Sequence, residues 1–185
     1  PGQGLLLVEA NNFIPASPEL STLISSNVTD CVVGGVLITN QGILDIGAGS
    51  GNFSLPLAGK VKRGKVFCLD SSREMTDFLE KKARQKSLQH IIHIIPRDAA
   101  STGLGDGCVD WVVSGNCMHE MSHPEKVLEE IYRVLKPRGA AFIVDFTDRH
   151  GFSDGDSHGP YSVQELSGLM NHAGFQNVLV EKKRH

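Results

Sequence analysis

The stretch Ile43-Leu44-Asp45-Ile46-Gly47-Ala48-Gly49-Ser50-Gly51 decides the fold of this chain. It joins a short apolar run to glycines that alternate with single residues. Such a run is typical of a strand buried on both faces of a sheet. Glycines directly after it permit a tight turn and let the backbone approach a ligand without an intervening Cβ. The helix that follows would point its free N–H groups at that turn. The stretch therefore predicts a strand that ends in a nucleotide-binding loop.

Outward from this stretch, short apolar runs alternate with amphipathic ones along the rest of the chain. The runs that predict strands are 43–46, 65–69, 91–95, 108–113, 140–144 and 177–182. Helices are predicted at 72–87, 123–135 and 162–173, where apolar side chains recur at helical spacing. Alternation of this kind implies parallel strands joined by right-handed helical crossovers. We therefore expect an α/β fold, a doubly wound and mostly parallel sheet with helices on both faces.

The first 40 residues follow a different pattern. Residues 18–26 look helical, and 31–39 are consistent with either a capped helix or a strand. Residues 40–42, Asn-Gln-Gly, indicate a turn. We therefore predict an N-terminal helical segment at 1–40 and a ligand-binding domain at 41–185, within a single domain overall.

Composition narrows the classes of partner. A chain of 185 residues with a net charge of -3 lacks the basic excess of a dominant phosphate-binding surface, which argues against a nucleic acid partner. No apolar run approaches the length of a membrane span, so we expect no membrane contact. The four cysteines form no C-x-x-C pair, which favours a reducing cytoplasm. Residues 119–123 spell H-E-x-x-H, but Pro124 follows directly where a zinc pair needs a continuous helix, so we expect no metal site.

Two carboxylates follow predicted strands at the edge where the glycine loop lies. Asp70 ends the second strand, where a carboxylate can accept both hydrogen bonds of a ribose diol. The alternative for Asp70 is a helix cap, because Ser71 and Ser72 follow it. Asp98 follows the third strand, and its alternative is an ordinary surface loop acid. Asp70 supports a nucleoside ligand without distinguishing between cofactors.

The order Asp-x-Gly-x-Gly-x-Gly at 45–51 resembles the first motif of the class I S-adenosylmethionine (SAM)-dependent methyltransferases. A dinucleotide fingerprint, G-x-G-x-x-G, would place its third glycine at Asn52. Residues 105–114 resemble the fourth strand of the ubiquinone/menaquinone-type methyltransferases, and 124–140 resemble their next helix and Lys-Pro-Gly-Gly turn. Arg138 and Ala140 depart from that turn, and the resemblance extends roughly over residues 40–182.

The resemblance implies a Rossmann-like methyltransferase of the EC 2.1.1 class that binds SAM and acts on a small-molecule acceptor. In this family the acid at the position of Asp98 faces the adenine amino group, and the next residue supplies a backbone N–H. The cofactor-binding residues implied are Asp45, Gly47, Ala48, Gly49, Gly51, Asp70, Ser71, Met75, Asp98, Ala99, Ser114 and Asn116. Two alternatives stay open: an NAD-dependent oxidoreductase, which Asn52 and the Asp98-Ala99 pair disfavour, and a non-catalytic SAM-binding module.

The loop 114–121 after the fourth strand is expected to face the transferred methyl group. Methyl transfer is an in-line displacement, so the protein mainly has to position the acceptor and exclude water. A general base is needed only where the nucleophile begins protonated with a high pKa. His119, oriented by Glu120, is the candidate base. The alternative is that both side chains make only local contacts, and Cys117 is expected to be a small packed residue.

The family sheet ordinarily finishes with a seventh, antiparallel strand between the fifth and the sixth. Here 177–182 would be the sixth strand, and no further strand follows it in the sequence. We therefore expect the usual final antiparallel strand to be missing, which would leave unpaired backbone groups beside the fifth strand. The alternative is that another part of the chain fills this edge.

Overall fold

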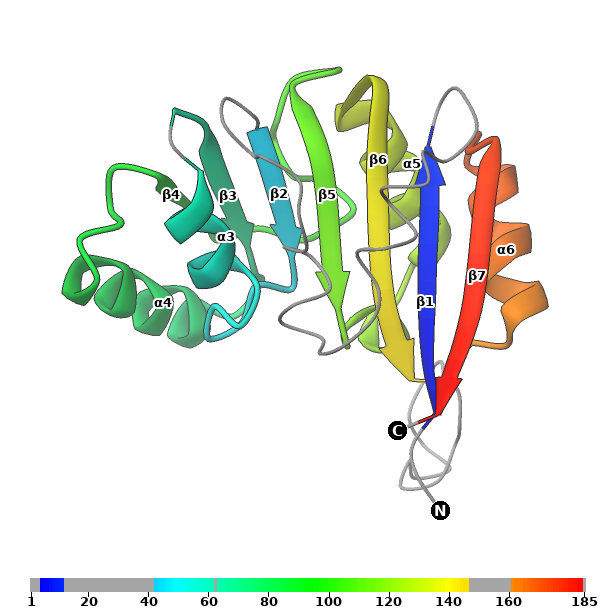
Figure 1. Ribbon diagram of the computed structural model, residues 1–185, viewed down its shortest axis with the longest axis horizontal. Coiled ribbons are helices and arrows are strands. Elements are labelled where there is room, and N and C mark those ends of the chain that lie inside the picture. Colours follow the sequence, from blue (N-terminus) through cyan, green and yellow to red (C-terminus); the bar gives the residue numbers. More distant parts are fainter. Residues whose placement is uncertain (1–3, 12–41, 62, 147–160, 185) are drawn as a thin grey trace.

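A seven-stranded sheet forms the centre of the computed structural model, which describes residues 4–11, 42–61, 63–146 and 161–184 (Figure 1). The strands are β1 (Gly4–Asn11), β2 (Gly42–Ile46), β3 (Lys65–Leu69), β4 (Ile92–Ile95), β5 (Val109–Gly115), β6 (Leu135–Phe146) and β7 (Asn177–Arg184). Their order across the sheet is β4-β3-β2-β5-β6-β1-β7. The strands from β2 to β6 pair in parallel, which confirms the α/β doubly wound prediction.

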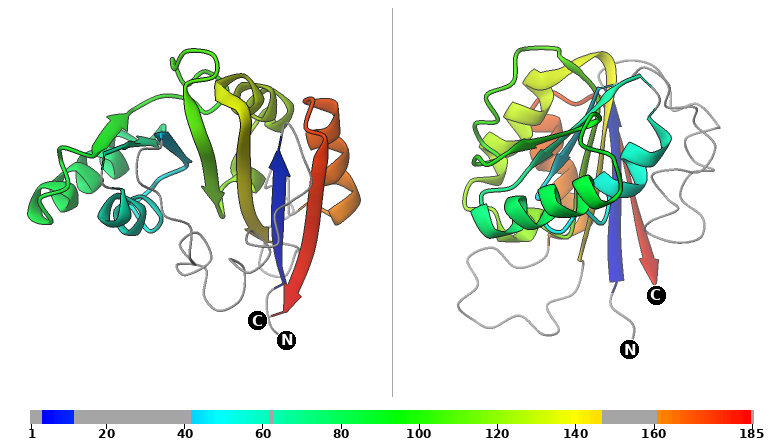
Figure 2. Two further views of the ribbon diagram at one scale, coloured as in Figure 1. Left: turned by 45° about the horizontal axis from the view of Figure 1, so that its top comes forward. Right: turned by 90° about the vertical axis from the view of Figure 1, so that its left-hand side faces the viewer.

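Helices cover both faces of this sheet (Figures 1 and 2). They are α3 (Ser54–Lys60), α4 (Arg73–Gln85), α5 (Pro124–Val134) and α6 (Val163–His172), with a 3₁₀ turn η1 (Met118–Glu120) after β5. The predicted helices at 72–87, 123–135 and 162–173 correspond to α4, α5 and α6. Ser72 and Ser162 accept hydrogen bonds from backbone N–H groups of the first turn, as N-caps do. No helix in the described ranges combines the length and apolar character that a bilayer crossing requires.

Strand β2 contributes side chains to two hydrophobic cores, one on each face of the sheet. Ile43 of β2 packs with α3 and α4, and the adjacent Leu44 packs with α5 and α6 on the other face. Both side chains are almost completely buried. Alternate residues of a strand point to opposite faces, so a run that is apolar at every position suits a sheet covered on both sides.

The position of the expected missing strand is occupied by β1. This strand lies antiparallel between β6 and β7, with Leu7 opposite both Val144 and Glu181. No strand follows β7 in the described ranges, but the expected unpaired edge beside β6 is corrected, because an N-terminal strand pairs with both β6 and β7. The prediction of a helical segment at 1–40 is wrong for residues 4–11, and residues 12–41 lie outside the described ranges. The predicted boundary between an N-terminal segment, 1–40, and a ligand-binding domain, 41–185, stays a prediction.

The chain reverses its direction of winding at β2. It passes from β2 outward to β3 and β4, and then crosses to β5 on the other side of β2. Open α/β sheets bind ligands beyond the carboxyl ends of their strands at such a switch point. The loops after β2 and β5 are therefore the expected walls of a ligand site.

Candidate cofactor site

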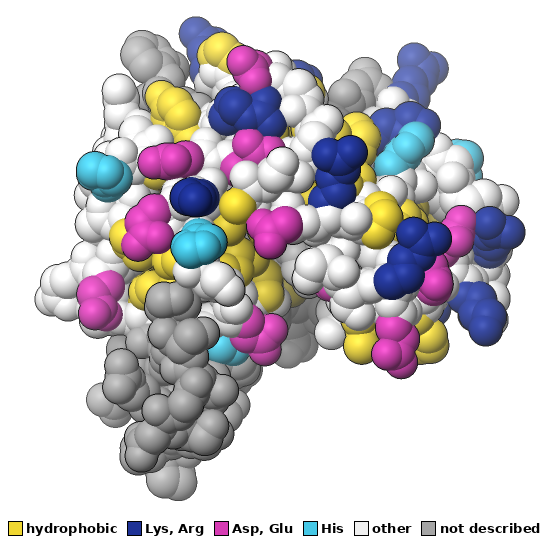
Figure 3. All heavy atoms as spheres, turned by 180° about the vertical axis from the view of Figure 1, so that it is seen from behind, with side chains coloured by type: hydrophobic (Ala, Val, Ile, Leu, Met, Phe, Trp, Pro, Cys, Tyr) yellow, Lys and Arg dark blue, Asp and Glu magenta, His cyan; other side chains and the backbone are white. Residues whose placement is uncertain are grey.

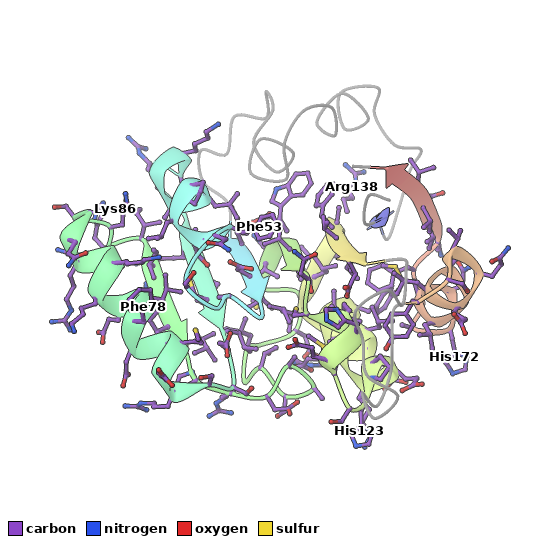
Figure 4. The ribbon with its side chains drawn as sticks, turned by 90° about the horizontal axis from the view of Figure 1, so that it is seen from below. Phe53, Phe78, Lys86, His123, Arg138 and His172 are labelled. Atoms are coloured by element: carbon purple, nitrogen blue, oxygen red, sulfur yellow. The ribbon has the colours of Figure 1, made fainter. Side chains whose placement is uncertain are left out.

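A cleft of about 400 Å³ opens at this switch point. Its walls come from the loops after β2, β3, β4 and β5 and from the start of α5. The lining residues are Gly47, Gly49, Leu69, Asp70, Ser71, Arg97, Asp98, Ala99, Ala100, Gly115, Asn116, Cys117, Glu120, Met121, Ser122, His123 and Val127. Figure 4 views the carboxyl ends of the strands, with Phe53 near the middle and His123 at the periphery.

The glycine loop, residues 47–51, has the backbone geometry that requires glycine. Gly47, Gly49 and Gly51 have φ angles of +67°, +49° and +89°, in the left-handed region that side chains disfavour. A Cβ on Gly47 would lie 2.5 Å from Sγ of Cys117, and one on Gly51 would collide with Leu79 of α4. The loop is therefore packed closely on one side while its other side lines the cleft.

Asp70 connects the glycine loop to the start of α4. Its Oδ2 accepts the N–H of Gly49 at 2.8 Å, and its Oδ1 accepts the N–H of Ser72 at 2.8 Å. Each carboxylate oxygen has a second lone pair, so Asp70 can still accept hydrogen bonds from a ligand in the cleft. The helix cap itself is Ser72.

Asp98 lies on the loop that follows β4, exposed at the cleft. Its Oδ1 accepts the N–H of Ala100 at 2.7 Å, which leaves Oδ2 for a ligand. Ala99 and Ala100 line the same wall. An acid beside an exposed main chain, in a cleft that also holds the glycine loop and Asp70, fits a nucleoside whose base and ribose are recognised separately.

Asp45 has a different place from the one expected of a ligand-binding residue. Its side chain is buried, and its Oδ2 accepts a short hydrogen bond from Oγ of Ser54 in α3. Burial raises the pKa of Asp45 to about 7, in opposition to the hydrogen bonds from Ser54. Asp45 therefore joins the end of β2 to the start of α3, on either side of the glycine loop, and its direct contact with a cofactor stays a prediction.

Four more of the expected residues lie outside the cleft lining. Ala48 is buried, and its N–H donates to the carbonyl of Leu69 at 2.9 Å. Ser114 is buried with its Oγ 3.1 Å from Sγ of Cys117. Gly51 packs against Leu79. Met75 is exposed and lies with Phe78 on a separate groove along α4. The cleft brings together Gly47, Gly49, Asp70, Ser71, Asp98, Ala99, Asn116 and Glu120.

His119 lies behind the cleft wall in the 3₁₀ turn after β5. Its ring Nδ1 is 2.5 Å from Oδ1 of Asp145, and its own N–H donates to Oδ2 of that residue at 3.0 Å. The opposite ring nitrogen, Nε2, is 3.7 Å from Oε1 of Glu120, which does line the cleft. The pairing with Asp145 was missed in the sequence, although an acid at the end of a predicted strand was the available signal.

Cys117 fits the packing role expected of it. Its thiol donates to the carbonyl of Ile46 at 3.2 Å and lies directly under Gly47. Burial raises the pKa of Cys117 to about 12, so the thiol stays protonated. Sequence reasoning also missed Arg97, Ser122 and His123 as parts of the cleft wall. Within the described residues, no group of three or more His, Cys, Asp or Glu side chains is placed to hold a metal ion.

Comparison with known proteins identifies the family. The model of the methyltransferase domain family matches residues 44–143. A demethylmenaquinone methyltransferase of Lactobacillus johnsonii is 36% identical over 103 residues, covering 55% of this chain and 42% of the relative. A ubiquinone/menaquinone biosynthesis C-methyltransferase, UbiE, of Blochmanniella floridana is 30% identical over 106 residues, covering 57% of this chain and 42% of the relative. The chain thus spans less than half the length of these two relatives.

Solved structures show the same fold. A SAM-dependent methyltransferase from Aquifex aeolicus superposes with a TM-score of 0.70 at 24% identity, covering 85% of this chain and 89% of that one. The [4+2]-cyclase SpnF superposes with a TM-score of 0.69 at 23% identity, covering 85% of this chain and 56% of that one. The chain belongs to the methyltransferase domain family, which confirms the class I resemblance, the Rossmann-like fold and SAM as the family's cofactor. The NAD-dependent alternative is not favoured.

Proposed function

We propose that this chain binds SAM in the cleft at the switch point and transfers its methyl group to a small-molecule acceptor. The observation that carries the proposal is Asp70, which accepts the N–H groups of Gly49 and Ser72 and faces the cleft beside the glycine loop. Bound SAM supplies an electrophilic methyl group on a sulfonium. The protein holds the ribose at Asp70 and the base at the wall formed by Asp98, Ala99 and Ala100.

The acceptor side of the proposed site is the loop after β5. Asn116 and Glu120 line the cleft there, and His119 lies behind Glu120. When Nδ1–H of His119 donates to Asp145, the neutral ring has its lone pair on Nε2, the nitrogen nearer to Glu120. His119 then removes a proton at Nε2 from an acceptor whose nucleophile begins protonated.

The acceptor chemistry fits this arrangement of a base. The relatives' names include a demethylmenaquinone methyltransferase and ubiquinone/menaquinone C-methyltransferases. The two-electron-reduced hydroquinone form of such a molecule has a hydroxyl, and its ring carbon becomes a better nucleophile when that hydroxyl loses a proton to a positioned base. We extend a small-molecule acceptor of this kind to the chain as part of the proposal.

The surroundings in which the chain acts are also proposed. On the face that carries α5 and α6, Lys and Arg side chains are interspersed with Asp and Glu, which is unlike a phosphate-binding surface (Figure 3). Cys68, Cys108 and Cys117 are free thiols. Both features support a cytoplasmic enzyme that acts on a small molecule and binds neither nucleic acid nor membrane.

The experiment combines binding with turnover. Titration calorimetry of the chain with SAM and with NAD is expected to show binding of SAM alone, and binding of NAD alone would overturn the proposal. Transfer of label from methyl-labelled SAM into a metabolite extract is then expected. Binding without any transfer would favour the alternative of a non-catalytic SAM-binding module.

A further inference from the structure

The loop between β4 and β5 presents the wall at which we place the nucleoside base. Residues 96–108 have no helix or strand, and Arg97, Asp98, Ala99 and Ala100 of this loop line the cleft. An irregular loop supports a selective site only where other elements hold it in place. Residues of α5 hold this loop in place.

Glu130 of α5 holds the loop two residues beyond Ala100. Its Oε1 accepts the N–H of Thr102 at 2.9 Å and the Thr102 hydroxyl at 2.6 Å. Thr102 is only 1% exposed and Glu130 only 9%. A carboxylate that accepts both donors of one buried residue fixes its backbone and its side chain together.

Arg133, on the next turn of α5, balances the charge of Glu130 and adds a second attachment. Its Nε and Nη2 each donate to Glu130 at 2.8 Å, and Nη2 also donates to the carbonyl of Leu104 at 2.8 Å. Its Nη1 forms an ion pair with Asp106. The hydrogen bonds from Arg133 and Thr102 hold the pKa of Glu130 at about 2.

The attachment at Thr102 is coupled to Asp98 through a tight turn. The N–H of Ser101 donates to the carbonyl of Asp98 at 3.1 Å, and the N–H of Ala100 donates to its Oδ1 at 2.7 Å. Because Thr102 follows directly, a shift of Thr102 would displace the turn that orients Asp98 and Ala99. None of Thr102, Glu130 and Arg133 lines the cleft itself.

We propose that Glu130 and Arg133 are positioning residues for the nucleoside base of the cofactor. By holding Thr102 and Leu104, they fix Asp98 where its carboxylate meets the amino group of the base, and Ala99 where its N–H meets a ring nitrogen. The pair thereby sets the preference for a 6-amino over a 6-oxo purine. The inference rests on the proposed SAM site, and it assigns to Glu130 and Arg133 the selectivity of that site for the purine base.

The test compares two ligands on the full chain by calorimetry: S-adenosylhomocysteine and its 6-oxo analogue S-inosylhomocysteine. E130Q puts an amide NH₂ against the donors of Arg133, and T102V removes the hydroxyl while keeping the shape of the side chain. Either variant is expected to lose roughly tenfold in affinity for the adenosine ligand, with a much smaller change for the inosine ligand, as expected when a charge-assisted network is disrupted. The turnover number at saturating SAM is expected to stay unchanged. E129Q, at an exposed position on the same helix, is the matched control and should behave like the wild type.

The outcomes separate the inference from the proposed function. If a folded E130Q or T102V loses affinity for both ligands equally, or for neither, the base-positioning role is overturned. If E130Q does not fold, the nearly isosteric T102V decides the matter alone. Wild-type protein that binds neither ligand would instead overturn the proposed SAM site, and the base subsite with it.

Discussion

The carboxylate of Asp145 holds His119 at two points, with Oδ1 2.5 Å from ring Nδ1 and Oδ2 accepting the main-chain N–H at 3.0 Å. Asp145 is the penultimate residue of β6, and His119 lies in the 3₁₀ turn after the neighbouring strand β5, so the contact joins that turn to the end of β6. Both side chains are buried. A carboxylate that orients an imidazole also selects its tautomer, so the proposed role of His119 as a base assigns proton acceptance to Nε2.

Removal of this imidazole is expected to affect turnover and leave cofactor binding intact. H119A should lower kcat by roughly 10²–10⁴-fold, the usual contribution of a general base, with an unchanged Kd for SAM. D145N should lower kcat as well, because an amide at this position can donate to Nδ1 and favour the wrong tautomer. Steady-state rates with an identified acceptor, together with calorimetry, measure both effects.

His172, exposed at the end of α6, provides the control for that experiment (Figure 4). H172A removes a histidine far from the cleft lining and should leave kcat unchanged. Full turnover by a correctly folded H119A would show that His119 makes only local contacts, which is the alternative that the sequence left open.

Mutations can distinguish the ligand-binding role of Asp70 from the helix-capping role of Ser72. D70N is expected to weaken SAM binding by about 10–100-fold, because it removes a charged acceptor both for the ribose and for the N–H of Gly49. S72A should leave the affinity nearly unchanged and lower the free energy of unfolding by about 1 kcal/mol, since Ser72 is the N-cap of α4. Calorimetry and urea unfolding distinguish these effects, with D77N on the exposed side of α4 as a control. Equal affinities of D70N and D77N for SAM would contradict a ribose-binding role.

Sequence patterns predicted those parts of the fold and of the site that depend on residues adjacent in the chain. The apolar run before Gly47 predicted β2, and the helical spacing of apolar residues in 72–87 and 162–173 predicted two helices that the structure confirms. The glycine loop was recognisable because positive φ angles and close packing restrict those positions to glycine. Each of these features depends on a few consecutive residues, so it can be predicted from the sequence alone.

The parts that the sequence did not reveal depend on contacts between distant segments. Asp145 meets His119 only because β5 and β6 pair in the register that brings Ser114 opposite Ile143. The N-terminal strand could not be placed from a local run either, because its two partners come from the other end of the chain. Asp45 was expected to face a ligand, and only the position of Ser54 shows that its carboxylate turns into the protein.

The central place of β1 gives a stability prediction. Leu7 pairs with Val144 on one side and Glu181 on the other, so a proline there interrupts a strand that is hydrogen-bonded along both edges. L7P should lower the free energy of unfolding by at least about 1–3 kcal/mol, the cost of unsatisfied buried backbone groups. G4P is the control, because proline is tolerated at the first residue of a strand. Equal urea midpoints for L7P and G4P would contradict the placement of β1 within the sheet.

The buried carboxyl of Asp45 predicts that the stability of the chain falls as pH rises through neutrality. Burial raises its pKa in the folded protein from 3.8 to about 7, so the folded state binds a proton that the unfolded state has released. The stabilising contribution of this group is therefore complete below pH 3.8 and is lost progressively as the pH approaches 7.

D45N has no charge to bury at any pH, and its amide oxygen can still accept the hydrogen bond from Ser54. It should therefore be more stable than the wild type at pH 8, by at most about 4 kcal/mol, with the difference shrinking towards pH 4. Urea unfolding of both proteins between pH 4 and pH 8 measures this difference. Stability curves that run parallel across this range would show that Asp45 titrates as an ordinary exposed carboxyl does.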